Sequence, residues 1–269
     1  MLEQAEQEAM VEDVWRRYLT TGDFGKERRQ RQFFRLLPGT PRCKNCYAPF
    51  QGMGSAIVRL VYQKQPSKLN PQLCNFCDVF ASRYQGGAEV ELSLLFADVR
   101  GSTTLAESMD TRAYSKLINR FYNTATQIMV RSDALIDKIT GDQVVGIYVP
   151  GFTGSAHARR ALQAAQDILR ATGHGRGRAP WIPIGIGIHT GVAFVGSVGS
   201  PQGASDITVL GDAANTAARL SSSAGRGEIL LSDVAYSTNA SVLGALEQRQ
   251  LELKGKSEPM RVHVLPSAV

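Results

Sequence analysis

The stretch LLFADVRGST, Leu94 to Thr103, decides the fold, because it sets a carboxylate directly after the most apolar run in the chain. Leu94 to Ala97 are typical of a buried strand. Gly101 and two hydroxyl residues follow Asp98, which predicts a turn that leads into a helix. A carboxylate in this place is either the cap of that helix or a ligand for a cation.

The composition indicates a folded protein outside the membrane. The chain has 269 residues, 43% of them hydrophobic, which suits one large domain or a medium domain with a smaller module. No apolar run approaches the roughly 20 residues that a membrane span needs. The N-terminal segment MLEQAEQEAMVEDVW is acidic and polar, unlike a signal peptide. We therefore expect a soluble, cytoplasmic protein without membrane insertion.

Positive charge is the main electrostatic feature. The net charge is +6, and the densest basic run is KERRQRQFFR, Lys26–Arg35. The first interpretation is the solvated face of a basic helix, and contact with nucleic acid or an acidic surface is the alternative. A substrate that bears phosphates would also suit a basic chain.

Periodicity predicts an ordered series of elements. One or two helices are expected between residues 8 and 35, broken near TTGDFG, and residues 84–89, YQGGAE, are expected to be a short linker. Strands and helices follow it in the order strand, helix, strand, strand, helix, strand, which predicts an α+β, ferredoxin-like (βαββαβ) domain behind a small helical and four-cysteine module. The expected elements are strand 90–99, helix 111–131, two strands within 134–149, helix 155–172, strand–turn–strand over 181–199, strand 207–211, helix 212–223 and strands 228–232 and 260–265. The domain boundaries that we expect are an N-terminal helical segment 1–41, a cysteine module 42–84 and the α+β domain 89–269.

A second carboxylate stands in a similar position. Asp142 lies in the turn of ITGDQVVGIY, at the edge of another apolar strand. If the two strands are sheet neighbours, Asp98 and Asp142 meet at one edge, where their charges repel and call for cations. Mg²⁺ is bound by one or two carboxylates together with substrate phosphates, and two ions about 3.5–4 Å apart can hold both oxygens of a phosphoryl displacement. The pair therefore favours a metal site over a helix cap.

Five motifs in order resemble those of a known family. From about Glu89 to the C-terminus, the chain resembles the class III nucleotidyl cyclases. The matching motifs are FADVRGST, KITGD, GIGIHTGVAFVGSVG, TVLGDAANTAAR and LKGK. The resemblance implies a ferredoxin-like catalytic core that works as a head-to-tail homodimer. It also implies two sites at the dimer interface, each built from residues of both subunits.

The resemblance further implies a role for particular residues of this chain. Two Mg²⁺ or Mn²⁺ ions per active site would be held by carboxylates and a backbone carbonyl, and backbone N–H groups at a helix start would cradle the triphosphate. One pair on a helix would orient the ribose and stabilise the transition state. The implied residues are Asp98, Val99 and Asp142 for the metal, Gly101, Ser102, Thr103 and Lys254 for the phosphates, Lys138 and Thr208 for the base, and Asn215 and Arg219 for catalysis.

The base-reading pair favours ATP. Lysine only donates hydrogen bonds, and threonine both donates and accepts, which suits the ring nitrogen and amino group of adenine. Guanylate cyclases of the family typically carry Glu and Cys at the positions of Lys138 and Thr208. Two positions depart from the common adenylate cyclase pattern. Thr208 replaces an Asp, as in a Thr-bearing bacterial subgroup that is often bicarbonate-responsive, and Val192 stands where some members carry a phosphate-contacting Arg.

All cysteines of the chain lie in two CxxC pairs, CKNC and CNFC. Cys43, Cys46, Cys74 and Cys77 are clustered in sequence, which in a cytosolic chain favours a metal over disulfides. Four thiolates suit structural zinc, and an iron–sulfur cluster uses the same ligands, so both remain open. Neither pair is followed by glycine, as many zinc knuckles are. Regulation of the catalytic domain by this module is a hypothesis.

The expected function is an adenylate cyclase that makes cyclic AMP and pyrophosphate by a two-metal mechanism at a homodimer interface. A guanylate cyclase is the alternative enzyme, which Lys138 disfavours. A zinc-ribbon nucleic-acid-binding protein with a nucleotide-sensing domain is the alternative without catalysis, supported by Lys26–Arg35. We expect ATP as the ligand and a second copy of the chain as the partner, and we do not expect nucleic acid.

Overall fold

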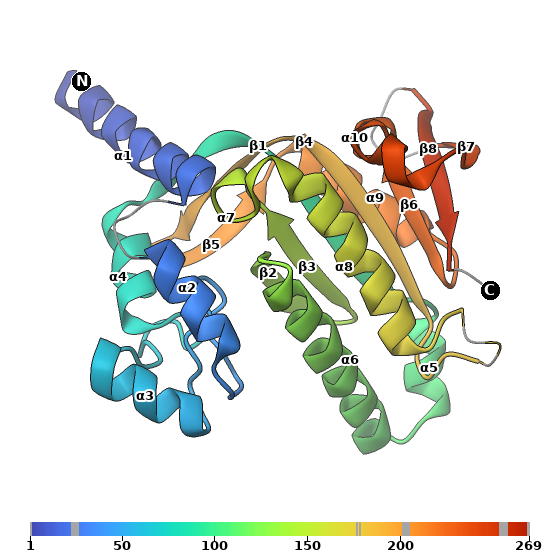
Figure 1. Cartoon of the computed structure of the whole chain (residues 1–269), viewed down its shortest axis with the longest axis horizontal. Coiled ribbons are helices and arrows are strands. Elements are labelled where there is room, and N and C mark those ends of the chain that lie inside the picture. Colours follow the sequence, from blue (N-terminus) through green and yellow to red (C-terminus); the bar gives the residue numbers. More distant parts are fainter. Residues whose placement is uncertain are drawn as a thin grey trace. The chain divides into compact units, whose positions relative to one another are not determined.

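The computed structural model describes residues 2–22, 27–175, 177, 179–200, 205–252 and 258–267 (Figure 1). The chain forms two compact units. The first comprises Met1–Val90, Val149–Gly154 and Ala193–Leu210, and the second comprises Glu91–Tyr148, Ser155–Val192 and Gly211–Val269. Within the described ranges, no helix is long and apolar enough to cross a membrane.

The second unit is built on a mixed sheet. Its strand order is β2-β3-β1-β4-β6-β8-β7, with β1 paired antiparallel to β3 and β4 paired parallel to β6. The core of the sheet is apolar, since residues of the central strands such as Leu94, Ile186 and Leu230 are fully buried. The strands are β1 Gly86–Val99, β2 Leu135–Thr140, β3 Gln143–Tyr148, β4 Ile184–Gly199, β6 Glu228–Ser232, β7 Glu247–Leu251 and β8 Met260–Pro266.

Helices cover this sheet through their apolar faces. The helices α6 (Thr111–Arg131) and α8 (His157–Thr172) lie side by side and both pack on β3 (Figure 1). Asp110 caps α6 by accepting hydrogen bonds from the backbone N–H groups of Arg112 and Ala113. The remaining helices of this unit are α5 (Ser102–Ser108), α9 (Asp212–Ser223) and α10 (Asp233–Leu243), and a 3₁₀ turn, η1 (Gly154–Ala156), begins at the unit boundary and precedes α8.

One predicted turn is wrong. Residues 184–199 form a single long strand, β4, instead of the expected strand–turn–strand. The glycines in this segment serve close packing: a Cβ on Gly187 would overlap the backbone of Ala217 and Ser221 in α9. Of the glycines in β4, only Gly199 at its end has a positive φ. The glycine pattern therefore marks the approach of a helix and not a reversal of the chain.

The first unit holds the N-terminal helices and the cysteines. Its helices are α1 (Leu2–Thr21), α2 (Glu27–Leu36), α3 (Met53–Tyr62), α4 (Asn75–Arg83) and α7 (Pro150–Thr153), together with the strand β5 (Ser205–Leu210). α1 packs on α7, and the indole Nε1 of Trp15 donates to the carbonyl of Tyr84 at 2.8 Å. β5 pairs antiparallel with the end of β4, and α4 packs against β5.

The glycine pair in YQGGAE opens β1 instead of forming the expected linker. Gly86 has φ 116°, a value that glycine adopts without strain. A Cβ on Gly87 would overlap the backbone of Val195 and Gly196, so the two strands approach as closely as their backbones allow. The other expected strands and helices are present, and the predicted fold class is confirmed: a mixed α/β fold follows N-terminal helices with a four-cysteine cluster.

Candidate functional site

The two acidic side chains from the strand ends lie at one edge of the sheet. In the antiparallel register Asp98 of β1 faces Gln143 of β3. Asp142, the residue before Gln143, therefore lies next to Asp98 at this edge. The backbone N–H of Val99 donates to the carbonyl of Asp142 at 3.0 Å. Burial raises the pKa of the Asp98 carboxyl, and the negative charge of Asp142 raises this pKa as well. An edge with two close carboxylates can bind a divalent cation through hard oxygen donors.

Asp98 does not cap the following helix. The N-cap of α5 is Gly101, in the left-handed conformation with φ 66° and ψ 31°, and no side chain caps this end. Gly101 and Thr103 are exposed and Ser102 is half-buried. The first N–H groups of a helix have no intrahelical acceptor, so they are available to an anion. The helix-cap explanation of Asp98 therefore has no support among the described residues.

Arg100 is a component of this edge that the sequence analysis missed. Its guanidinium forms an ion pair with the Asp98 carboxylate, and its Nη1 donates to the carbonyl of Ser222 at 2.7 Å. The positive charge of Arg100 acts to lower the pKa of Asp98, against the larger effect of burial. Arg100 directly follows the last residue of β1, so its closeness to Asp98 in the sequence made the ion pair foreseeable.

The expected catalytic pair lies on α9. Asn215 is exposed and Arg219, one turn later, is half-buried, so both are on one face of the helix. The opposite face is anchored by buried residues, among them Ala217 and Leu220. The exposed Val192, at 58%, stands in β4 where a phosphate-contacting Arg was considered.

The expected base-reading residues are placed less completely. Lys138 lies in β2, and its backbone alone is described. Thr208 lies in β5 of the first unit and is buried, with 7% of its surface exposed. No hydrogen-bond partner for its hydroxyl occurs among the residues that the structure describes. Lys254 lies outside the described residues.

The four cysteines come together in the first unit. Cys43, Cys46, Cys74 and Cys77 are all buried, and their sulfur atoms lie within 4.8 Å of one another. None of them forms a disulfide. Cys74 is the N-cap residue of α4 and Cys77 lies in its first turn, where the positive end of the helix dipole favours thiolates. The set can therefore bind a metal ion.

The first cysteine pair forms a tight turn around an unusual residue. The backbone N–H of Tyr47 donates to the carbonyl of Cys43 at 2.9 Å, and Tyr47 has φ 66°. This left-handed conformation is the one that glycine supplies in many zinc knuckles, and it is costly for tyrosine. Tyr47 is fully buried, and the Arg31 guanidinium stacks 3.8 Å from its ring centroid and donates to its hydroxyl. Burial and this contact stabilise the turn.

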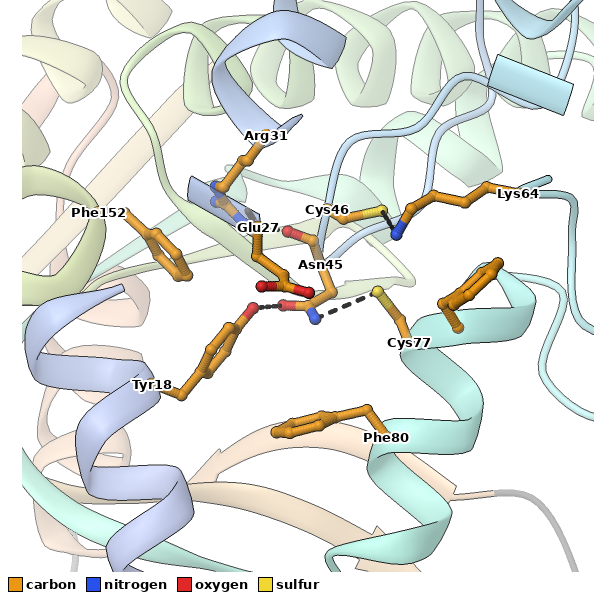
Figure 2. A pocket seen from close by; sticks show the side chains of 10 residues that line it. Tyr18, Glu27, Arg31, Asn45, Cys46, Lys64, Cys77, Phe80 and Phe152 are labelled. Carbon is orange, nitrogen blue, oxygen red and sulfur yellow. Dashed lines mark hydrogen bonds between the residues drawn. The ribbon is translucent and has the colours of Figure 1, made fainter. Parts of the chain in front are cut away.

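A small cavity lies beside two of the sulfurs. It measures about 80 Å³ and is drawn in Figure 2. The Tyr18 hydroxyl donates to Asn45 Oδ1 at 2.7 Å, and Asn45 Nδ2 donates to Cys77 Sγ at 3.4 Å (Figure 2). Lys64 Nζ lies 4.0 Å from Cys46 Sγ. Asn45 from within the first CxxC motif, and Tyr18 and Lys64 from outside both motifs, therefore complete the surroundings of the sulfurs. No spacing in the sequence identifies Tyr18 and Lys64 as neighbours of the cysteines.

The basic helix is only partly solvated. In α2 Arg28 and Arg29 are exposed, as expected for a solvated basic face. Arg31 is buried at 3% exposure, where it also donates to the carbonyl of Asn45. One cation of the Lys26–Arg35 run therefore belongs to the interior of the first unit, and Lys26 lies outside the described residues.

Comparison with known proteins identifies the family of residues 86–267. They match the family model of the adenylate and guanylate cyclase catalytic domain. An adenylate cyclase from Anabaena cylindrica is 31% identical over 169 residues, which are 61% of this chain and 32% of that protein. Adenylate cyclase 1 from Rhizobium meliloti is 28% identical over 48% of this chain and 20% of its own length. The chain thus spans a third or less of these two curated relatives.

Solved structures resemble the same region. The crystal structure of the adenylyl cyclase CyaB from P. aeruginosa is 30% identical with a TM-score of 0.58, covering 67% of this chain and 96% of that one. The guanylyl cyclase Cya2 has a TM-score of 0.60 at 24% identity, covering 67% and 93%, and so shares the fold. The cysteines, at positions 43 to 77, precede the region matched by the family model.

Proposed function

The chain belongs to the adenylate and guanylate cyclase catalytic-domain family, and on this basis we propose that it is an adenylate cyclase that converts ATP to 3′,5′-cyclic AMP and pyrophosphate. The observation that carries the proposal is the meeting of Asp98 and Asp142 at the paired ends of β1 and β3. The choice of ATP is supported by the donor and acceptor chemistry of Lys138 and Thr208 and by the names of the two curated relatives.

The donor set at the sheet edge fits a divalent cation. Two carboxylates and the carbonyl of Val99 are hard oxygen ligands of the kind that Mg²⁺ and Mn²⁺ prefer. Burial raises the pKa of Asp98, and a nearby cation would reverse this by favouring the ionised carboxylate. Two such ions per site, when bound, supply positive charge that acidifies the ribose 3′-hydroxyl and neutralises the triphosphate.

The remaining residues bind and orient the nucleotide. The N–H groups of Gly101, Ser102 and Thr103 hold the phosphates at the start of α5, with Lys254 at the terminal phosphates. Asn215 orients the ribose, and Arg219 stabilises the charge that develops as the 3′-oxygen bonds to the α-phosphorus and pyrophosphate departs. These assignments follow the family motifs, residue by residue.

The active unit in this proposal is a head-to-tail homodimer. One chain supplies Asp98 and Asp142, and the other supplies Asn215 and Arg219, to each of two sites. The exposed position of Asn215 on α9 supports this, since the side chain is accessible to a partner. Mixing Asp98→Ala chains with Arg219→Ala chains should restore part of the activity that each lacks alone. Confirmed mixing without any recovery would contradict shared sites.

A metal on the four cysteines is the second part of the proposal. Four buried thiols within 4.8 Å of one another support either zinc or an iron–sulfur cluster. Because this module precedes the catalytic region, we propose that it regulates or stabilises the cyclase. It does not take part in the chemistry at Asp98.

Product analysis with ATP and GTP in the presence of Mg²⁺ or Mn²⁺ tests the enzyme assignment. Asp98→Ala and Asp142→Ala should each abolish turnover and leave the fold intact. Asp167→Ala is the matched control, because Asp167 is a half-buried carboxylate that pairs with Arg170 on α8, and its loss should leave turnover unchanged. Cyclic GMP as the main product would select the guanylate cyclase alternative. Full activity of either Asp98→Ala or Asp142→Ala would refute the metal assignment.

A further inference from the structure

The spacing of the four sulfurs distinguishes one ion from a cluster. All four lie within 4.8 Å of one another, and Cys46 Sγ and Cys74 Sγ are 3.6 Å apart. Four thiolates around one Zn²⁺, with bonds of about 2.3 Å to tetrahedral corners, stand about 3.8 Å apart. In an iron–sulfur cluster the thiolates are distributed over several iron atoms, so their sulfurs stand farther apart. The observed spacing therefore matches a single ion.

Hydrogen-bond donors surround the sulfurs. The backbone N–H of Cys74 donates to Cys43 Sγ at 3.2 Å, and Asn45 Nδ2 donates to Cys77 Sγ. The Lys64 ammonium lies beside Cys46 Sγ and is itself buried, with 7% exposed. N–H donors directed at sulfur stabilise thiolates, which are the form that binds metal.

We infer that the four cysteines hold one structural Zn²⁺ ion and no iron–sulfur cluster. This inference rests on the proposed metal site and is independent of the cyclase assignment. A closed set of four thiolates leaves no position for a substrate, as in structural zinc sites. Zinc also binds a given set of donors more tightly than Fe²⁺ does. The ion would join the turn Cys43–Tyr47 to the start of α4.

Metal analysis of the purified full chain tests the inference. We expect a colourless protein with one zinc per chain and only background iron and acid-labile sulfide. Exchange for Co²⁺ should produce the visible absorption of tetrahedral cobalt thiolate, and Cys43→Ser should lower the zinc content. Because this variant can fail to fold, the stoichiometry of the unmodified chain decides. Stoichiometric iron, or a folded chain without metal, overturns the inference, whatever the cyclase activity.

A separate observation connects the cysteine module to β5 within the first unit. Lys44 lies between Cys43 and Cys46, its side chain is 6% exposed, and it forms an ion pair with Asp206. Nearby, Asn70 Nδ2 donates to the carbonyl of Ser205 at 2.9 Å. The backbone N–H of Lys44 also donates to the carbonyl of Gln72 at 3.0 Å. Side chains from both halves of the module thus reach consecutive residues of β5.

These contacts lead to the strand that carries Thr208. Asp206 and Thr208 are two residues apart on β5 and therefore point to the same face. We propose that Lys44 is a positioning residue, which holds β5 so that Thr208 can meet the nucleotide base. This proposal rests on the base-reading role of Thr208. Since Lys44 lies between two of the metal-binding cysteines, Cys43 and Cys46, loss of the metal would release this strand.

The test uses Lys44→Met, which keeps the length of the side chain and removes its charge. We expect the KM for ATP to rise several-fold and the preference for ATP over GTP to fall, with kcat and zinc content retained. Lys44→Arg should restore the KM, and Lys68→Met is the matched control, because Lys68 is an exposed lysine of the same module. An unchanged KM and preference overturn the proposal.

A second measurement separates this proposal from the proposed function. Amide hydrogen exchange reports the opening of β5 whether or not the chain cyclises ATP. In Lys44→Met the amides of residues 205–210 should exchange faster than in the unmodified chain, and those of β6 should not change. Unaltered exchange in β5 refutes the positioning role. A chain without any cyclase activity but with faster exchange refutes only the enzyme assignment.

Discussion

Replacing Thr208 by valine changes a buried hydroxyl into a methyl group of nearly the same shape. The Thr208 hydroxyl lacks a hydrogen-bond partner among the described residues, and the residue is only 7% exposed. A buried polar group that is left unpaired costs about 1–3 kcal/mol. Without nucleotide, Thr208→Val should therefore raise the free energy of unfolding by about 1–3 kcal/mol.

The same variant should weaken the use of ATP. If the hydroxyl pairs with the adenine base in the complex, its loss removes about 1–3 kcal/mol of binding, which corresponds to a fall in kcat/KM of about 5- to 150-fold. The kcat/KM for GTP should change less, so the preference for ATP should narrow. Urea denaturation gives the first quantity, and initial rates with ATP and GTP give the second.

Thr190→Val is the control of opposite sign. Thr190 is also buried, with 2% of its surface exposed, and its hydroxyl forms a hydrogen bond of 2.7 Å with the Ser93 hydroxyl. Its removal leaves Ser93 with one partner fewer, so this variant should lower stability by about 1 kcal/mol. A Thr208→Val protein that is destabilised like Thr190→Val would contradict the unpaired state of the hydroxyl. Greater stability with unchanged ATP kinetics would contradict base recognition.

Three further predictions concern charge and packing. Asp98→Asn should raise the melting temperature of the metal-free protein, since burial raises the pKa of the Asp98 carboxyl and so disfavours its charged form. In the unmodified metal-free protein, stability should correspondingly increase as pH falls towards this raised pKa. A lower melting temperature of Asp98→Asn by calorimetry in EDTA would contradict this. The Arg249 guanidinium lowers the Glu228 pKa, so this stabilisation is present above the ordinary Glu pKa and is lost as pH falls through the lowered value. Glu228→Gln should flatten that acid limb in melting curves, and an unaltered limb would assign it to other groups. Gly187→Ala should destabilise by about 1–3 kcal/mol or more, because the added methyl meets the α9 backbone. Gly191→Ala, whose methyl would meet mainly the His189 side chain, is the control in denaturant titrations, and equal stability of the two variants would disprove close packing at Gly187.

Most of the catalytic fold was predictable from local patterns. The helix at 111–131 and the helix at 212–223 were placed at their observed bounds, because their apolar spacing and flanking residues are unambiguous. The family suggested by the five motifs is confirmed. The helix α10 and the strand β7 were missed. The strand β7 is polar and largely exposed, so its sequence lacks the apolar alternation by which a strand is recognised.

The errors arose where tertiary contacts decide. Rules based on local sequence predict a turn at the glycines of β4. In the structure these glycines allow α9 and the start of β1 to pack closely against the strand. Asp98 and Asp142 lie close together only because β1 and β3 pair. The sequence alone did not establish that these two strands are neighbours in the sheet. Lys64 beside Cys46 was not foreseeable, because a lysine 18 residues away from the motif gives no spacing signal.

The turn at Tyr47 has a consequence for how this module tolerates substitution. Glycine at position 47 would relieve the backbone, yet it would deprive the buried Arg31 of its stacking ring and of one hydrogen-bond acceptor. Exchange of Arg31 for an apolar residue would in turn remove one donor from the buried Tyr47 hydroxyl and the cation from the face of its ring. Positions 31 and 47 are therefore expected to co-vary among related sequences. A relative with glycine at position 47 should also lack the arginine at position 31.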